Sequence, residues 1–259
     1  MDLHIKDKTA LVTGGTGGIG LAAAQALAAE GARVFITGRD SARLAEAVAA
    51  IGPQAQGILG DAATAAGAAA IIAALPKVDI LVNNLGIYES RAFAEITDEG
   101  WMAMLETNVL SGVRLSRHYL PAMQAQNWGR IIFVSSESAL ATPEDMIHYA
   151  TSKTAQLSVS RGLAQLTRGT GVTVNSVLPG PTRSAGIEAF LRSRSPHPEA
   201  PIAEVEAEFF ASDRPSSILR RMIDADEVAN LIAYLASPRS SATNGAALRV
   251  EGGLVNTIA

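Results

Sequence analysis

The sequence predicts an α/β protein with about seven parallel strands and helices on both faces of the sheet. Short segments rich in β-branched residues alternate with alanine-rich segments along all 259 residues. The strand candidates are apolar throughout rather than at every second position, which is typical of strands buried on both faces. No break in composition divides the chain, so we expect one domain over residues 1–259.

The expected elements follow one another in regular alternation. β-branched and other aliphatic residues favour strands, and alanine favours helices. Strands are expected over residues 9–13, 33–37, 56–59, 79–83, 130–135, 172–178 and 246–250. Helices are expected over residues 19–30, 41–50, 63–75, within 98–126, and over 149–167 and 225–236.

One long segment, from residue 182 to about 223, interrupts this alternation. It holds four prolines and several apolar clusters, including Ile218, Leu219 and Met222. An insertion of this length is usually a functional lid or a disordered loop, and the clusters favour short helices packed over a cleft. We therefore expect a helical substrate lid over about residues 185–222. Its apolar side chains either line the cleft or pack within the lid, and those concerned are Ile187, Phe190, Phe209 and Phe210.

The helix expected after the lid has a recognisable start. Asp224 is the predicted N-cap, and Glu227, three residues later, completes a capping box.

Composition excludes several classes of protein. The formal net charge of −4 argues against a nucleic-acid binder, which needs a basic surface. The chain has no cysteine, and its four histidines have no metal-ligand spacing, so we expect no metal site. We find no signal-peptide pattern and no apolar run long enough to span a membrane, so the expected location is the cytoplasm.

A glycine-rich segment, residues 13–20 (TGGTGGIG), lies between the first strand and the first helix. Glycines there permit a tight turn and close approach of the backbone to a pyrophosphate, and the helix start offers free N–H groups to the phosphates. The pattern therefore predicts a dinucleotide site on a doubly wound Rossmann fold. Three glycine spacings fit at once, beginning at Gly14 or Gly15, so the turn alone does not decide between subfamilies.

Further motifs follow in order along the chain. Residues 83–86 (NNLG) end the fourth strand, and Ser136 ends the fifth. Residues 149–153 (YATSK) place Tyr149 and Lys153 on one helix face. Residues 179–180 (PG) follow the sixth strand, and residues 251–253 (EGG) follow the last.

Together with Asn108, these motifs resemble those of the short-chain dehydrogenase/reductase family, with Leu85 where the family usually has alanine. The chain length is similar to that of the compact branch, which includes 3-oxoacyl reductases. The resemblance implies a catalytic set of Asn108, Ser136, Tyr149 and Lys153. Ser136 is preferred over Ser135 because it lies thirteen residues before Tyr149 and strand neighbours point to opposite faces.

The resemblance also implies a chemistry. Tyr149 would exchange a proton with the substrate oxygen, and Ser136 would orient that oxygen. Lys153 would bind the nicotinamide ribose, and Asn108 would help to hold a proton-relaying water. A nearby ammonium group favours the phenolate, so we expect Lys153 to lower the pKa of Tyr149 from its usual value near 10.

The expected cofactor is NADP(H), with NAD(H) as the less favoured alternative. The second strand ends at Gly38 where NAD enzymes usually place a carboxylate, and Arg39 follows with a guanidinium suited to a 2′-phosphate. Asp40 is expected to cap the next helix. The complete set of cofactor-binding residues that we expect is Gly14, Thr16, Gly18, Ile19, Gly20, Arg39, Asp61, Ala62, Asn84, Gly86, Tyr149, Lys153, Pro179, Gly180, Thr182 and Ser184.

The predicted function is hydride transfer between the nicotinamide and a ketone or secondary alcohol, with a 3-oxoacyl or related keto compound as the candidate substrate. A non-catalytic dinucleotide-binding regulator is the alternative; such proteins are expected to lack part of the catalytic set, which is complete here. An epimerase or dehydratase is disfavoured by the short chain. The resemblance further implies a homotetramer or homodimer formed through the helices at 102–126 and 149–168. Glu144, Asp145 and His148 are expected only at the rim of the pocket.

Overall fold

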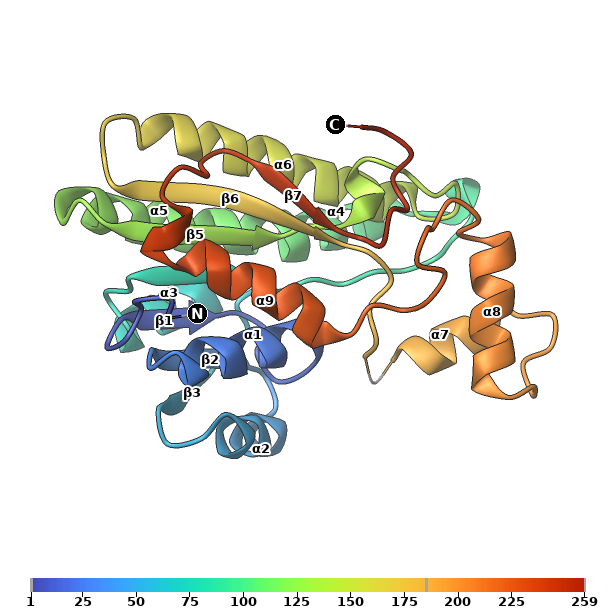
Figure 1. Cartoon of the computed structure of the whole chain (residues 1–259), viewed down its shortest axis with the longest axis horizontal. Helices are drawn as coiled ribbons and strands as arrows, with labels where there is room; N and C mark the ends of the chain where they lie inside the picture. The colour runs from blue at the N-terminus through green and yellow to red at the C-terminus, as the bar shows by residue number, and fades with distance from the viewer. Residues whose placement is uncertain (1, 185, 259) are drawn as a thin grey trace.

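The computed structural model describes residues 2–184 and 186–258. Seven parallel strands form one sheet in the order β3-β2-β1-β4-β5-β6-β7 (Figure 1). Their bounds are β1 Thr9–Val12, β2 Arg33–Gly38, β3 Ala55–Leu59, β4 Ile80–Asn83, β5 Gly129–Val134, β6 Val172–Pro179 and β7 Ala247–Val250. Strands β1, β4, β5 and β6 are buried along their whole length, as their uninterrupted apolar sequences predict.

Helices cover both faces of this sheet (Figure 1). On one face pack α1 (Gly18–Ala29), α2 (Ser41–Ile51) and α9 (Ala225–Ala236), around a core that includes Leu27 and Ile232. On the other pack α3 (Ala65–Ala74), α5 (Ser111–Ala125) and α6 (Ile147–Leu166), around Leu115 and Phe133. The sequence-based prediction of a doubly wound α/β fold is confirmed, with element ends displaced by one or two residues.

The helical region predicted within residues 98–126 is divided in two. α4 (Asp98–Leu105) passes into a π-helical turn, Glu106–Leu110, before α5 begins. Such single π turns are often found at functional sites, and this one contains Asn108. The sequence pattern predicts a helix here. It does not predict the π turn, because one additional residue in a single turn hardly changes the helical periodicity.

The predicted lid begins at residue 185, which lies outside the described residues. From residue 186 onward it contains α7 (Ile187–Arg194) and α8 (Ile202–Ser212), which stand beside the body of the molecule (Figure 1). Their shared core includes Leu191, Val205 and Phe210. Asp224 and Glu227 form the predicted capping box of α9.

The third apolar cluster of the lid is not helical, contrary to our expectation. Arg220 has a φ of 50°, which a helix does not allow, and the backbone N–H groups of Ile218 and Leu219 both donate to the Gly252 carbonyl. Ile218 is 80% exposed. This segment therefore follows the turn after β7 instead of covering the cleft.

Candidate active site

A cleft of about 450 Å³ lies at the carboxyl ends of the strands, between the sheet and the lid. The strand order reverses between β1 and β4, and ligands of open α/β sheets bind at such a point. The cleft is lined by residues from the glycine turn, the ends of β4, β5 and β6, helix α6 and the lid. All of these are segments that the sequence motifs had singled out.

The glycine turn has little room for side chains. Gly14 and Gly18 adopt φ values of 63° and 52°, which favour glycine. A Cβ on Gly20 would lie 2.4 Å from both the Gly14 carbonyl oxygen and the Asn84 amide nitrogen. Asn84 Nδ2 donates to the carbonyls of Thr13 and Gly14 at 2.9 and 3.2 Å, so β4 holds the turn in place.

The start of α1 fits the phosphates of a dinucleotide. Within the described chain, no side chain caps this helix start, and its first turn contains no acidic residue. Thr16, Gly18, Ile19 and Gly20 line the cleft at this point. The free N–H groups and the positive end of the helix dipole are suited to a pyrophosphate.

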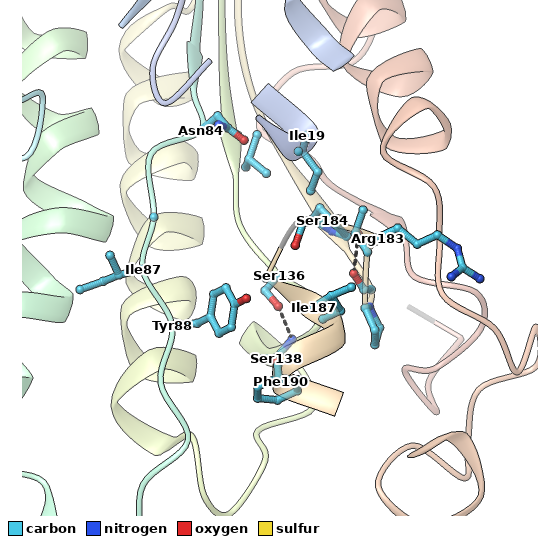
Figure 2. A pocket seen from close by; sticks show the side chains of 18 of the residues that line it. Ile19, Asn84, Ile87, Tyr88, Ser136, Ser138, Arg183, Ser184, Ile187 and Phe190 are labelled. Atoms are coloured by element: carbon cyan, nitrogen blue, oxygen red, sulfur yellow. Dashed lines mark hydrogen bonds between the residues drawn. The ribbon is translucent and has the colours of Figure 1, made fainter. Parts of the chain in front are cut away.

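Ser135 and Ser136 both line the cleft, but their hydroxyl groups have different partners. Ser136 Oγ accepts from Ser138 N at 3.1 Å, and Figure 2 shows the Tyr88 hydroxyl pointing toward Ser136. Ser135 Oγ donates to the Lys153 carbonyl at 2.9 Å and so packs against α6. The structure thus brings Ser136 to the place that the sequence predicted and assigns Ser135 to helix packing.

Tyr149 and Lys153 project from α6 into the same cleft. Lys153 Nζ donates to the Val134 carbonyl at 3.0 Å and lies 5.7 Å from the centre of the Tyr149 ring. Burial lowers the pKa of Lys153 to about 8, opposed by the charge of Glu137. This ammonium group is therefore held by the end of β5 beside the tyrosine.

The expected lowering of the tyrosine pKa is not found among the groups of the chain. Burial raises the pKa of Tyr149 above its usual value, and the charge of Glu137 raises it further, while a hydrogen bond with Ser136 acts in the opposite direction. The expectation rested on Lys153, together with the positive charge of an oxidised nicotinamide, and left out burial of the phenol; the Lys153 ammonium group donates to the Val134 carbonyl. In the absence of cofactor and substrate, burial therefore favours the protonated phenol more strongly than water does.

Asn108 is fully buried behind the cleft rather than lining it. Its side chain donates to the Ile87 carbonyl at 3.0 Å and accepts from Ile87 N at 2.8 Å. Its own backbone carbonyl accepts from Gln156 Nε2. The π turn therefore fixes the loop after β4, including Gly86, whose missing Cβ leaves room for Lys153 Nζ.

A second cleft, of about 340 Å³, adjoins the first at the end of β2. It is lined by residues that include Gly14, Thr16, Arg39, Asp61 and Ala62. Arg39 lies 3.8 Å from the Asp61 carboxylate and is largely exposed. The two clefts together contain the expected residues for both ends of a dinucleotide.

The end of β2 excludes an acidic side chain at position 38. A Cβ on Gly38 would lie 2.6 Å from Thr16 Cγ2. Asp40 accepts from Arg43 N at 3.0 Å as the N-cap of α2, as the sequence predicted. Arg43 lines both clefts and was not predicted from the sequence. It lies at the start of α2, and its side chain extends toward the glycine-rich segment.

The lid lines one side of the cleft with a mixture of polar and aromatic groups. Pro179, Gly180, Thr182 and Ser184 follow β6 along the cleft wall, and Thr182 Oγ1 donates to the Gly180 carbonyl at 2.8 Å. Beyond them, Ile187, Phe190 and Phe209 also line the cleft. Phe210 does not, because it is buried within the lid against Phe209, so the lid side chains serve both of the roles that the sequence left open.

Glu137 is a further cleft residue that sequence reasoning missed. It follows Ser136 directly, lines the cleft and is buried, with its carboxylate accepting from Ser136 Oγ at 2.5 Å. Burial raises its pKa, while bonds from the neighbouring serines and the charge of Arg214 lower it. A glutamate after a strand usually predicts a solvated loop residue, so only the structure reveals this group.

The titratable residues before Tyr149 are not at the rim of the pocket. His148 is fully buried, 3.6 Å from the Glu89 carboxylate, and Asp145 forms an ion pair with Arg194 of the lid. Glu144 is exposed.

We find no group of histidine and acidic residues that could hold a metal ion, and no helix able to cross a membrane, among residues 2–184 and 186–258.

Comparison with known proteins agrees with this geometry. The sequence model of the short chain dehydrogenase family matches residues 8–194. The chain is 46% identical to the uncharacterized oxidoreductase YvaG of Bacillus subtilis (strain 168), over the whole of both proteins. It is 34% identical to the 3-oxoacyl-acyl-carrier-protein reductase FabG of Escherichia coli (strain K12), covering 97% of this chain and 99% of that one.

A solved structure with the same fold is the L-sorbose reductase of Gluconobacter frateurii, complexed with NADPH and L-sorbose. It superposes with a TM-score of 0.91 at 28% identity, and the match covers both chains completely. The family match, the relatives and the arrangement of the cleft together place this chain in the short-chain dehydrogenase/reductase family, as an NAD(P)-dependent oxidoreductase.

Proposed function

We propose that this protein catalyses the NADP(H)-dependent reduction of a ketone to a secondary alcohol, with Tyr149 as the proton donor. The observation that carries the proposal is the convergence of Ser136, Tyr149 and Lys153 in one cleft, next to a glycine turn that fits a pyrophosphate. The phenol of Tyr149 is protonated at neutral pH, which is the form that can donate to an alkoxide.

Each residue of the predicted catalytic set has a role in this proposal. A bound nicotinamide supplies or accepts the hydride. Ser136 donates a hydrogen bond to the substrate oxygen, and Tyr149 protonates that oxygen as charge develops on it. Lys153 binds the ribose hydroxyls, and Asn108 positions the loop that carries Gly86 and Ile87.

The names of the relatives indicate keto compounds as the substrate class, without indicating which keto compound. One is named for 3-oxoacyl reduction and another for L-sorbose, in agreement with the keto substrate expected from the sequence. The test is an assay of NADPH oxidation with purified protein and a panel of simple ketones, hydroxy ketones and 3-oxoacyl thioesters. Turnover of at least one class supports the proposal; binding of NADPH without any turnover would instead support the regulator.

The cofactor preference rests on Arg39 and Arg43 at the second cleft. Replacing both by alanine is expected to raise KM for NADPH by about tenfold and to leave KM for NADH within about twofold, because exposed charge-assisted hydrogen bonds to a 2′-phosphate are lost. Steady-state kinetics with each cofactor measures this. Arg117→Ala, an exposed arginine on α5, is the matched control. A lower KM and higher kcat with NADH in the wild type contradicts the assignment.

We also propose that the protein is a homotetramer or homodimer. Apolar side chains are exposed on the helices expected at the interface, with Met102 on α4 at 58% and Leu166 at the end of α6 at 62%. Such side chains are enriched where surfaces associate. Sedimentation velocity at micromolar concentration distinguishes these states from a monomer.

A further inference from the structure

The carboxyl group of Glu137 occupies the cleft wall beside Ser136 and has no part in the chemistry proposed above. Its Oε2 accepts from Ser136 Oγ at 2.5 Å, and its Oε1 accepts from Ser138 Oγ at 3.3 Å. The residue is only 5% exposed. A buried carboxyl group is costly unless its hydrogen-bonding capacity is used, so its position in a substrate cleft calls for a partner.

The chain itself gives this carboxyl group few partners. An ionised carboxylate can accept about four hydrogen bonds. Two serine hydroxyls supply two of them, and the Ser138 backbone N–H also interacts with it. Arg214 Nε lies 3.9 Å away, which is an ion-pair distance but too long for a hydrogen bond. Arg214 also lies over the Phe209 ring and donates to the Asp213 carbonyl, so other contacts hold its guanidinium.

Substrate binding changes the number of hydrogen bonds that the Glu137 carboxyl group accepts, because it changes the partner of Ser136. A serine hydroxyl has one hydrogen, and Ser136 gives it to Glu137. When Ser136 donates instead to a substrate carbonyl, Glu137 Oε2 loses that bond inside a cleft that the substrate has closed to water. A substrate with only a carbonyl oxygen leaves the loss uncompensated, whereas a substrate with a neighbouring hydroxyl group replaces it.

We propose that Glu137 is a specificity-determining residue that binds a hydroxyl group on the carbon next to the reacting carbonyl. The substrate is then an α-hydroxy ketone, and the product is a vicinal diol. This inference rests on the proposed function and deepens it. The adjacent position follows from the 2.5 Å between Ser136 Oγ and Glu137 Oε2, since the two oxygens of an α-hydroxy ketone are likewise neighbours.

A hydroxyl group fits Glu137 in both of its protonation states. It donates to a carboxylate and accepts from a carboxylic acid, whereas the carbonyl of a 3-oxoacyl thioester can only accept. The apolar part of the cleft lining, which includes Ile187, Phe190 and Phe209, is suited to the carbon skeleton of the same substrate.

The test compares two ketones that differ only in this group, 1-hydroxy-2-butanone and 3-pentanone, in the NADPH oxidation assay. Wild type is expected to favour the hydroxy ketone by about 100-fold in kcat/KM, because a site built around a buried polar group rejects an analogue that leaves it unpaired. Glu137→Met is expected to reduce this ratio to below about tenfold, and Glu137→Gln, which keeps an amide acceptor and donor, to retain most of it.

For each variant, the ratio of kcat/KM for the two ketones does not change when part of the enzyme is unfolded, because both values fall by the same factor. Thermal unfolding and NADPH fluorescence titration confirm that each variant is folded and binds cofactor. Equal use of the two ketones by wild type, an unchanged ratio in Glu137→Met, or a preference for acetoacetyl thioester overturns the inference while the proposed reductase function stands. Absence of turnover with every ketone overturns both. The wild-type ratio alone decides the matter if Glu137→Met does not fold.

Discussion

Tyr149→Phe is expected to lower kcat for ketone reduction by about 10³-fold, because a positioned general acid contributes roughly 10² to 10⁴ to a proton-transfer step. The variant removes one oxygen atom and keeps the ring, which packs edge-to-face against Tyr88 at 6.4 Å. Lys153 is held by the Val134 carbonyl rather than by the phenol, so the cofactor site is expected to be intact. Single-turnover rates at saturating NADPH measure the loss at the chemical step.

Tyr88 provides the matched control for this experiment. Its hydroxyl lies in the same cleft, and Figure 2 shows it directed toward Ser136. Tyr88→Phe is expected to change kcat by less than about threefold, since side chains outside the proton-transfer step have small effects. A large loss in Tyr88→Phe combined with a small one in Tyr149→Phe would transfer the acid role to Tyr88.

NADPH affinity separates the catalytic role of Tyr149 from a structural one. We expect fluorescence titration to give the same dissociation constant for wild type and Tyr149→Phe within about twofold, because a lost substrate-side hydroxyl does not alter the glycine turn. A phenylalanine variant that binds NADPH poorly would show that the hydroxyl organises the site instead of donating a proton.

The fold and most of the cleft could be predicted from the sequence because their determinants are local. Uninterrupted apolar strands, the glycine turn before α1 and the i, i+4 spacing of Tyr149 and Lys153 each leave a pattern within a few residues. The parallel topology then brings all strand ends to one edge, so motifs far apart in the chain meet there.

The features that the sequence did not predict depend on which groups meet across the fold. From the sequence, Glu137 is predicted to be a solvated loop residue, whereas in the structure it is buried beside Arg214. The rise in the Tyr149 pKa comes first from the burial of its phenol and then from the charge of that carboxylate. Arg43 reaches the cofactor clefts only because α2 begins where it does. Each of these is a tertiary contact with no periodic signature.

Lys153→Met is expected to abolish most activity and yet raise the free energy of unfolding by about 2 kcal/mol at pH 7. Burial lowers the pKa of Lys153 from 10.5 to about 8, and such a shift corresponds to roughly 3 kcal/mol of penalty for holding the charged form in the folded state. Methionine has a similar length and no charge. Loss of the hydrogen bond to the Val134 carbonyl lowers the free energy of unfolding by roughly 1 kcal/mol, which leaves a net increase of about 2 kcal/mol.

The pH dependence gives this prediction a definite sign. Because the folded-state pKa is below the unfolded one, the unfolded chain binds more protons between about pH 8 and 10.5, and wild-type stability rises with pH across that window. The advantage of Lys153→Met should therefore be constant below about pH 8 and shrink as pH increases toward 10.5. Urea unfolding at a series of pH values measures both curves.

The exposed Lys77 supplies the control, since Lys77→Met should leave the stability curve unchanged. If Lys153→Met were less stable than wild type at pH 7, the ammonium group would be a net structural support, through Val134 and the charge of Glu137. If it is more stable, the lysine is kept in the core at a cost to folding. That second outcome would support the proposed roles of Lys153 in catalysis and cofactor binding rather than in packing.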